Sequence, residues 1–347
     1  MTRIARKLAG TSLPLALLLT AGTLDFAQSG PYKVITSTKV GGEGGFDYVS
    51  ADSAARKLYI ARSGPTGHIS VFDLDTLNPA GEIPGVSAHG VAIDTASHHG
   101  FASSKPVAMF DSVTLAPIKT IDVQGNPDGI LGDPGLGRVY ILSHSAPNVT
   151  VLDAKDGSIV GTVDLGGAPE QGVLDGKGHL YIDLEDKGSI AVVDTRTLAK
   201  TATYDLAGKG GTCAGLAMDV KNNILFAACR TPQTMVMLNA ANGAILDTQP
   251  LGMGTDGAVF NPKTMEAFSS QGDGTLTIVK EASPTSFSVE QTVTTKPRAK
   301  TLTLDTKTNH LVLITAEFQP PPPTPPGGKP ARGAMIPDTF TILVVGK

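Results

Sequence analysis

The sequence predicts an all-β fold, a seven-bladed β-propeller, and two observations carry this prediction. A short apolar run ending in Asp or Asn returns seven times, 39 to 44 residues apart, at Asp52, Asp94, Asp133, Asp175, Asp219, Asn261 and Asp305. After a turn, each copy is followed by a second apolar run, such as residues 58–60 or 139–141. A strand-rich repeat of about 40 residues is typical of a four-stranded propeller blade.

The segment from Gly125 to Gly167 shows the pattern of one blade most clearly. We expect its four strands, lettered a to d from the channel outwards, at residues 130–132, 138–142, 149–152 and 158–165. Pro134 and the glycines after it supply the backbone angles of a tight turn between the first two strands. Strand d alternates apolar and polar residues, as a half-exposed strand does.

The two ends of the mature chain are predicted to share the seventh blade. The last repeat supplies three strands, at residues 301–304, 309–314 and 339–345. Residues 32–40 resemble an outermost strand with no inner strands before it. Pairing the two fragments completes a blade and removes two exposed sheet edges. We therefore expect six continuous blades and one closed by the N-terminal strand, in one domain over residues 28–347.

Residues 1–27 are predicted to be a secretory signal peptide. Arg3, Arg6 and Lys7 form a positively charged start, and an apolar stretch over residues 9–21 follows. That stretch is too short to span a bilayer, so we expect no transmembrane segment in the mature chain. The residues before Ala27 fit the small-x-small cleavage rule poorly, which leaves the cleavage point open. The expected location is periplasmic or secreted.

Net charge and cysteine content limit the kinds of partner and the cellular compartment that we expect. The formal net charge of −4 is small and no basic cluster follows residue 10, which argues against nucleic acid as a partner. Cys213 and Cys229 lie at matching positions on either side of a turn at residues 220–223. We favour a disulfide between them over two free core thiols, since an exported protein meets an oxidising compartment.

Propeller geometry places the d–a and b–c loops on one face, and these loops are the longer and chemically richer ones in this sequence. Loops held on a rigid frame are the usual location of binding groups, so we expect a ligand site at the channel mouth on this face. The expected ligand-binding residues are Asp47, His89, Asp128, Glu170, Gln171, Asp256, Lys300, Arg62 and Arg230. The b–c loop residues His144 and Glu185 are expected further out.

The chemistry of this set leaves several interpretations open. One His among carboxylates suits a divalent metal ion, with His89, Asp128 and Asp256 as candidate ligands, although no cofactor is firmly indicated. His89 is also the candidate base of a metal-assisted hydrolase or lactonase. Alternatively, these groups only solvate a water-filled channel, and Asp128 already lies in a turn. The sequence favours a binding or interaction module, with an unknown small ligand or protein as partner, over an enzyme.

The stretch from Pro320 to Pro330 is of low complexity and interrupts the last blade between strands b and c. Proline lacks the backbone donor that a sheet requires and favours polyproline II. We expect the stretch to project from the ligand-side face or to lie across the channel mouth. A spacer is the simpler interpretation, and a lid or a docking segment for a partner is the alternative.

The repeats also resemble a known family. Residues 166–173 (Gly-Gly-Ala-Pro-Glu-Gln-Gly-Val), residues 125–130 and the b-strand phrase at residues 139–141 are similar to the YVTN-repeat β-propellers, exported bacterial proteins of the YncE-like type. The resemblance extends over the whole mature chain. It implies a propeller with a binding or surface role, while lactonases among relatives with this fold favour the enzyme alternative. It supplies no catalytic motif for individual residues of this chain.

Overall fold

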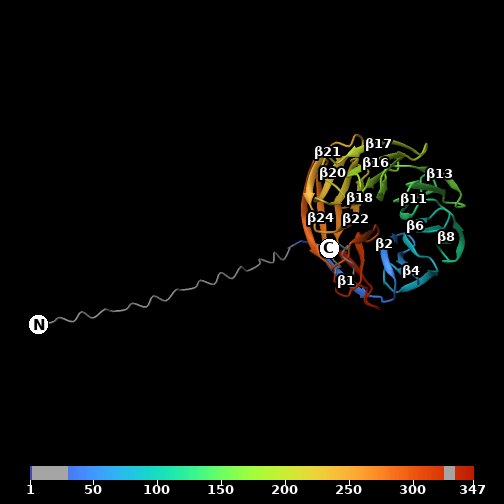
Figure 1. Cartoon of the computed structure of the whole chain (residues 1–347), viewed down its shortest axis with the longest axis horizontal. Helices are drawn as coiled ribbons and strands as arrows, with labels where there is room; N and C mark the ends of the chain where they lie inside the picture. Colours follow the sequence, from blue (N-terminus) through green and yellow to red (C-terminus); the bar gives the residue numbers. More distant parts are fainter. Residues whose placement is uncertain (2–29, 324–332) are drawn as a thin grey trace.

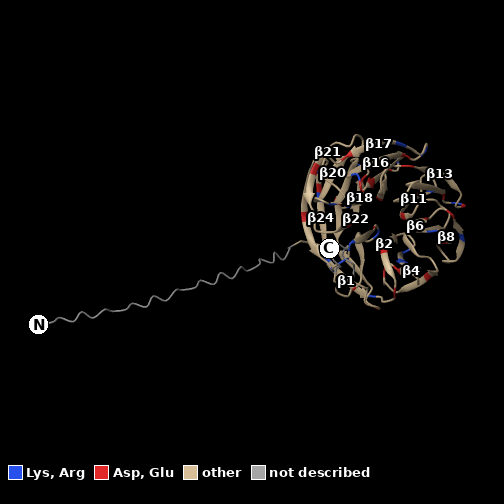
Figure 2. Ribbon diagram, in the orientation of Figure 1, with Lys and Arg blue, Asp and Glu red and all other residues tan. Residues whose placement is uncertain are grey.

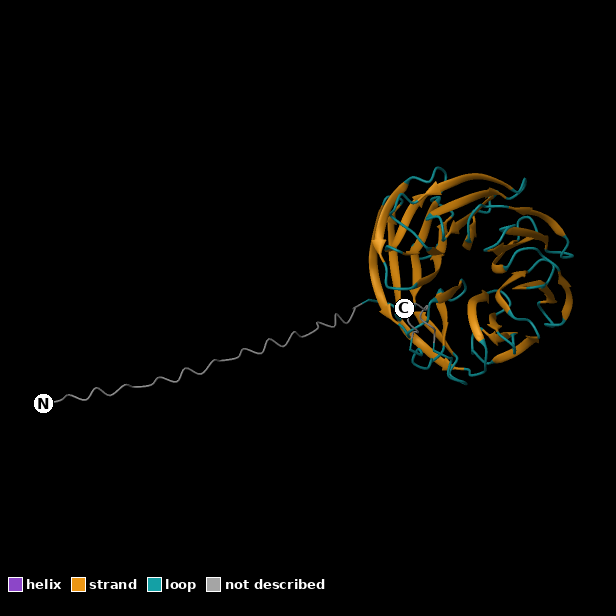
Figure 3. Ribbon diagram, in the orientation of Figure 1, coloured by secondary structure: helices purple, strands orange, loops and turns teal. Residues whose placement is uncertain are grey.

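Seven antiparallel sheets of four strands each form a ring in the computed structural model, which describes Met1 and residues 30–323 and 333–347 (Figure 1). Every helix or strand assigned within these residues is a strand (Figure 3). The predicted all-β, seven-bladed propeller is confirmed. The predicted signal peptide lies outside the described residues except for Met1, and so do residues 324–330 of the proline-rich stretch.

Six blades each take four consecutive strands, ordered from the channel outwards. Blades 1 and 2 contain β2 (Gly45–Asp52), β3 (Lys57–Ser63), β4 (His68–Asp73) and β5 (Pro79–Pro84), then β6 (Ala88–Asp94), β7 (His99–Ser104), β8 (Val107–Asp111) and β9 (Pro117–Ile121). Blades 3 and 4 contain β10 (Pro127–Asp133), β11 (Arg138–Ser143), β12 (Val149–Asp153) and β13 (Ile159–Val163), then β14 (Pro169–Leu174), β15 (His179–Leu184), β16 (Ser189–Asp194) and β17 (Ala199–Asp205). Blades 5 and 6 contain β18 (Cys213–Asp219), β19 (Ile224–Arg230), β20 (Gln233–Asn239) and β21 (Ile245–Pro250), then β22 (Thr255–Asn261), β23 (Glu266–Gln271), β24 (Thr275–Ser283) and β25 (Ser286–Thr294).

Both ends of the chain build the seventh blade. Its inner strands are β26 (Thr301–Asp305), β27 (His310–Thr315) and β28 (Thr341–Gly346), and its outermost strand is β1 (Lys33–Lys39). β1 runs antiparallel to β28, with Lys39 opposite Thr341 and Thr36 opposite Val344. Figure 1 shows β1 beside the C-terminus. The predicted closure of the ring by the N-terminal strand is confirmed.

Apolar side chains of the second and third strands pack between neighbouring blades. Leu58 and Ile60 of β3 share one buried cluster with Ile314 and Ile342 of blade 7. Similar clusters join other adjacent blades, for example blades 3 and 4. Burial of apolar surface is the main favourable term in folding, so these strands fix the blades relative to one another. The innermost strands and their loops therefore sit on a rigid frame.

The Asp or Asn that ends an innermost strand caps the turn that follows. Oδ1 of Asp52 accepts hydrogen bonds from the backbone N–H groups of Ala54 and Ala55, at 3.1 and 2.9 Å. Asp175 and Asp219 bond their turns in the same way. Side-chain acceptors of this kind stabilise tight turns, which explains the residue type at this position of the repeat.

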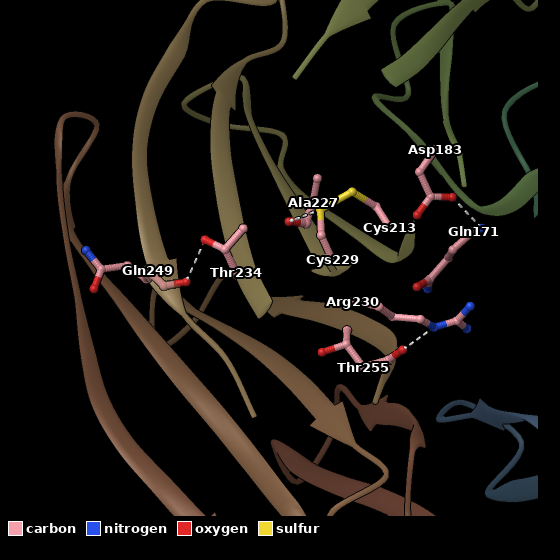
Figure 4. The surroundings of a disulfide bond; sticks show 9 residues. All are labelled: Gln171, Asp183, Cys213, Ala227, Cys229, Arg230, Thr234, Gln249 and Thr255. Atoms are coloured by element: carbon pink, nitrogen blue, oxygen red, sulfur yellow. Dashed lines mark hydrogen bonds between the residues drawn. A yellow bond between two sulfur atoms is a disulfide. The ribbon is translucent and has the colours of Figure 1, made fainter. Parts of the chain in front are cut away.

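Cys213 and Cys229 form a disulfide between β18 and β19 (Figure 4). The two residues are direct partners in the strand pairing, and both are buried. Arg230 follows Cys229 at the end of β19, so the disulfide fixes the point from which the Arg230 side chain extends. In the described part of the chain, no helix is long and apolar enough to cross a membrane.

Candidate functional site

Bulges at the start of the innermost strands aim side chains at the channel mouth. In six blades, the pairing of the innermost strand with its neighbour shifts register within the first few residues. A β-bulge adds a residue to one strand and re-aims its side chain. The residues within these shifts include Asp47, His89, Asp128, Glu170, Ala214 and Asp256. Thus five of the six bulged strands present an ionisable group, and blade 5 presents Ala214.

Eight ionisable side chains at the mouth form a closed circle in which carboxylates alternate with basic groups. In order, the members of this charge ring are Lys300, Asp47, His89, Asp128, His144, Glu170, Arg230 and Asp256. Seven of the eight nitrogen–oxygen contacts span 2.7–3.9 Å, and the eighth joins Lys300 to Asp256. All seven blades contribute. Figure 2 shows acidic and basic segments among the inner strands.

The two halves of the charge ring differ in the kind of base. Between Glu170 and Lys300 the bases are permanently charged, and both oxygens of Asp256 are taken by Arg230 and Lys300. Arg230 also contacts Glu185 at 3.1 Å. In the other half, the bases are imidazoles, which change charge near neutral pH. Carboxylates in that half therefore have partners that can lose their proton.

Asp128 lies between the two imidazoles in this second half of the charge ring, which runs from Asp47 to Glu170 and which we call the histidine half. Its Oδ1 lies 3.4 Å from Nδ1 of His89, and its Oδ2 lies 3.2 Å from Nε2 of His144. Oδ1 is buried and accepts no hydrogen bond from any described residue. A buried carboxylate oxygen without a donor is costly, so this atom marks the place where a positively charged group would be most stabilised.

Burial and nearby charges shift the pKa values of ionisable groups in this half of the charge ring. Burial raises the pKa of Glu170 to about 9, and the charges of Glu185 and Asp128 add to the shift. Burial likewise raises the pKa of Asp128, against the attraction of the His89 charge. The hydrogen bond with Asp47 raises the pKa of His89. Asp128 and Glu170 therefore keep their protons to a higher pH than in water, and a cation bound beside them would favour their ionised forms.

Two side chains near the charge ring link the inner strands of different blades. Tyr48 reaches from blade 1 to blade 4, where its hydroxyl donates to the backbone oxygen of Glu170 at 3.3 Å. Oε1 of Gln171 accepts from the backbone N–H groups of Leu216 and Ala258, and its Nε2 donates to the Ala258 oxygen. Tyr48 therefore links blade 1 to blade 4, and Gln171 links blade 4 to blades 5 and 6. We call the cavity at this mouth the cup.

The cup has a volume of about 720 Å³ and an apolar side wall. Phe46, Phe318 and Met335 line this wall, and Arg298 stacks on the Phe318 ring at 3.8 Å. Phe318 pairs with Met335 in an isolated β-bridge. These two residues flank the proline-rich stretch, so the described residues on either side of it lie at the rim of the cup.

Most of the residues expected at the site meet in the charge ring, and two do not. Arg62 is 1% exposed; its Nη2 donates to the Glu43 oxygen at 2.7 Å and its guanidinium lies over Phe340. It therefore stabilises the chain between β1 and β2 and does not reach the cup. The Gln171 side chain is committed to backbone groups of blades 5 and 6, as described above.

His144 lies closer to the channel than its place in a b–c loop predicted, and Tyr48 was not among the predicted site residues. Counting the strand register from the a–b turn would have placed His144 correctly. The turn that pairs Asp133 with Arg138 brings residue 143 opposite residues 127–128, which places His144 beside Asp128. Tyr48 gave no signal, because its contact with blade 4 depends on the diameter of the closed ring.

Comparisons with known proteins support the fold. No protein-family model matches the chain, and no curated protein does. The structure of U3-55K is similar, with a TM-score of 0.71 at 11% identity, over 90% of this chain and 98% of that one. The RRP9 WD40 repeats are similar too, with a TM-score of 0.70 at 11% identity, over 92% of this chain and 100% of that one. Such propellers are a common scaffold for protein interactions, and the YVTN family assignment stays a prediction.

Proposed function

We propose that this protein is an exported propeller of the YVTN type whose channel mouth binds a small cationic ligand. The composition of the cup carries this proposal. Five carboxyl groups line it, from Asp47, Asp128, Glu170, Glu185 and Asp256, against three permanent cations, from Arg230, Arg298 and Lys300, and a bound cation would favour the ionised form of Glu170, whose pKa burial raises. A concave site with excess negative charge concentrates cations.

The shape of the cup supports a small ligand. Its volume of about 720 Å³ is within the range of sites for small molecules, roughly 300–1,000 Å³. The apolar wall around Phe318 offers contact area for an organic body. Export is part of the proposal because the N-terminal leader pattern and the disulfide suit an oxidising compartment outside the cytoplasm.

A single fluorophore in the wall tests the proposal. The chain contains no Trp, so Phe318→Trp places the sole indole at the cup and preserves the stacking on Arg298. We expect spermidine or Mn²⁺ to change the emission with saturation, and acetate to leave it unchanged. Phe260→Trp, four residues beyond Asp256 on β22, is the control outside the cup. Equal responses in both variants, or no response to either cation, would refute cation binding at the mouth.

A metal-assisted hydrolase or lactonase is the second candidate. One observation favours it: two imidazoles flank Asp128, so a base lies next to the place where a metal-activated water would form. This candidate predicts hydrolysis of γ-butyrolactone or p-nitrophenyl acetate that requires an added divalent ion and is lost in Asp128→Ala. Hydrolysis by the wild-type protein that is no faster than hydrolysis by Asp128→Ala would exclude the hydrolase.

A further inference from the structure

We propose that the histidine half of the charge ring holds a pair of divalent metal ions bridged by the carboxylate of Asp128. The inference rests on the proposed cation site and specifies its ligand. Two groups of three potential ligands share Asp128: one adds Asp47 and His89, and the other adds His144 and Glu170. Within each group, the ligand atoms all lie within 4.8 Å of one another.

The two oxygens of Asp128 face opposite ways. Oδ1 faces His89 and Oδ2 faces His144, at 3.4 and 3.2 Å. A carboxylate in this arrangement can give one oxygen to each of two ions. Ions in two-metal sites stand roughly 3.5–4 Å apart, a separation that a bridging carboxylate matches. A single ion would leave one of the two imidazoles without a role.

The spacing of the other ligand atoms suits coordination. Nδ1 of His89 lies 2.8 Å from Oδ2 of Asp47, and Nε2 of His144 lies 3.9 Å from Oε2 of Glu170. Ligands at about 2.0–2.2 Å from a tetrahedral ion are roughly 3.3 Å apart, midway between these values. A divalent ion would take the place of the proton that His89 now shares with Asp47, since metal binding displaces protons from its ligands.

The kind of ion follows from the donor set. Each group offers one imidazole nitrogen and two carboxylates, a mixture that suits Mn²⁺ or Zn²⁺ better than Ca²⁺, which takes six to eight oxygens. Three protein ligands per ion leave a coordination position open toward the cup. Asp256 is excluded as a ligand, because Arg230 and Lys300 occupy both of its oxygens.

Metal stoichiometry tests the proposal on the full-length protein after dialysis against EDTA. We expect isothermal titration with Mn²⁺ or Zn²⁺ to give two ions per chain, and the Mn²⁺ form to show the spin-coupled electron paramagnetic resonance of an adjacent pair. Asp128→Asn keeps the shape of the side chain and should weaken binding of both ions by more than about 100-fold, because loss of even an outer-shell partner costs 10–100-fold. His89→Ala and His144→Ala should each retain one ion.

His98→Ala is the matched control, since that histidine is exposed in the turn before β7, on the other face. It should bind two ions, and thermal unfolding in EDTA should show that all variants fold. One ion or none per wild-type chain, or two ions in Asp128→Asn, overturns the pair. If Mn²⁺ and Zn²⁺ fail to bind while spermidine still changes the emission of the Phe318→Trp variant, the metal pair is wrong and the cation cup stands. If neither the metal ions nor spermidine binds, both the metal pair and the cation-binding cup are wrong.

Discussion

At the residue scale, a buried carboxyl group joins blades 5 and 6 on the face opposite the cup. Glu281 of β24 is 2% exposed, and its Oε1 accepts from the Asn222 side chain at 2.7 Å. Burial raises the pKa of Glu281 to about 7, and Asp219 adds to the shift through its charge and a hydrogen bond. Glu281 therefore keeps a proton at mildly acidic pH and donates it to Asp219.

Glu281→Gln should remove a pH dependence of stability. The folded-state pKa lies above the ordinary value, so between about pH 4.5 and 7 the folded chain holds a proton that the unfolded chain has lost, and stability falls as pH rises. A glutamine amide donates to Asp219 without titrating. We expect the variant to gain about 3 kcal/mol over wild type at pH 8 and nothing at pH 4, measured by urea unfolding. Glu82→Gln, at an exposed position of β5, should match wild type, and an unchanged pH slope in Glu281→Gln would contradict this assignment.

The sequence did not predict which of the loop side chains enter the cup. Loop position alone predicted that Asp47, His89 and Asp128 lie at one mouth. Whether a side chain enters the cup depends on the bulge that turns it, and no residue type announces that bulge. Arg62 and Arg230 were both expected in b–c loops, but Arg62 occupies the strand position that Cys229 occupies in blade 5, one residue before that of Arg230. Its guanidinium lies over the Phe340 ring.

At the element scale, the joint between the two ends of the chain reaches beyond the strand pairing of blade 7. Gln291 of β25 accepts from the Tyr32 backbone N–H at 3.0 Å, and its amide donates to the Tyr32 oxygen at 2.8 Å. The Tyr32 ring packs edge-on against Phe268, and its hydroxyl donates to Glu266. The residue before β1 is therefore fixed to blade 6.

Gln291→Ala should weaken this joint. The change removes two hydrogen bonds and leaves buried backbone groups of Tyr32 without partners, at a cost of about 1–3 kcal/mol each. We expect a lower midpoint of urea unfolding and faster hydrogen exchange in β1 than in the other blades' outer strands, measured by mass spectrometry. Gln233→Ala, at an exposed position, is the control. Uniform exchange across all blades would argue against a local joint.

At the scale of the whole molecule, the charge ring forms only when the seven blades close into a ring. Its eight members come from seven blades, and each contacts a partner from a neighbouring blade or loop. The number of repeats predicted the number of blades, and the strands counted at the two ends of the chain predicted the shared seventh blade. It did not predict the alternation of charges, because that order exists only once Lys300 of blade 7 lies beside Asp47 of blade 1.

Anomalous X-ray diffraction from crystals soaked in Mn²⁺ tests the central claim, that the histidine half of the charge ring holds cations. We expect two anomalous peaks in the cup, each about 2.0–2.2 Å from one oxygen of Asp128, with His89 nearest one and His144 nearest the other. Peaks confined to other surfaces of the propeller, with none between these two histidines, would contradict it.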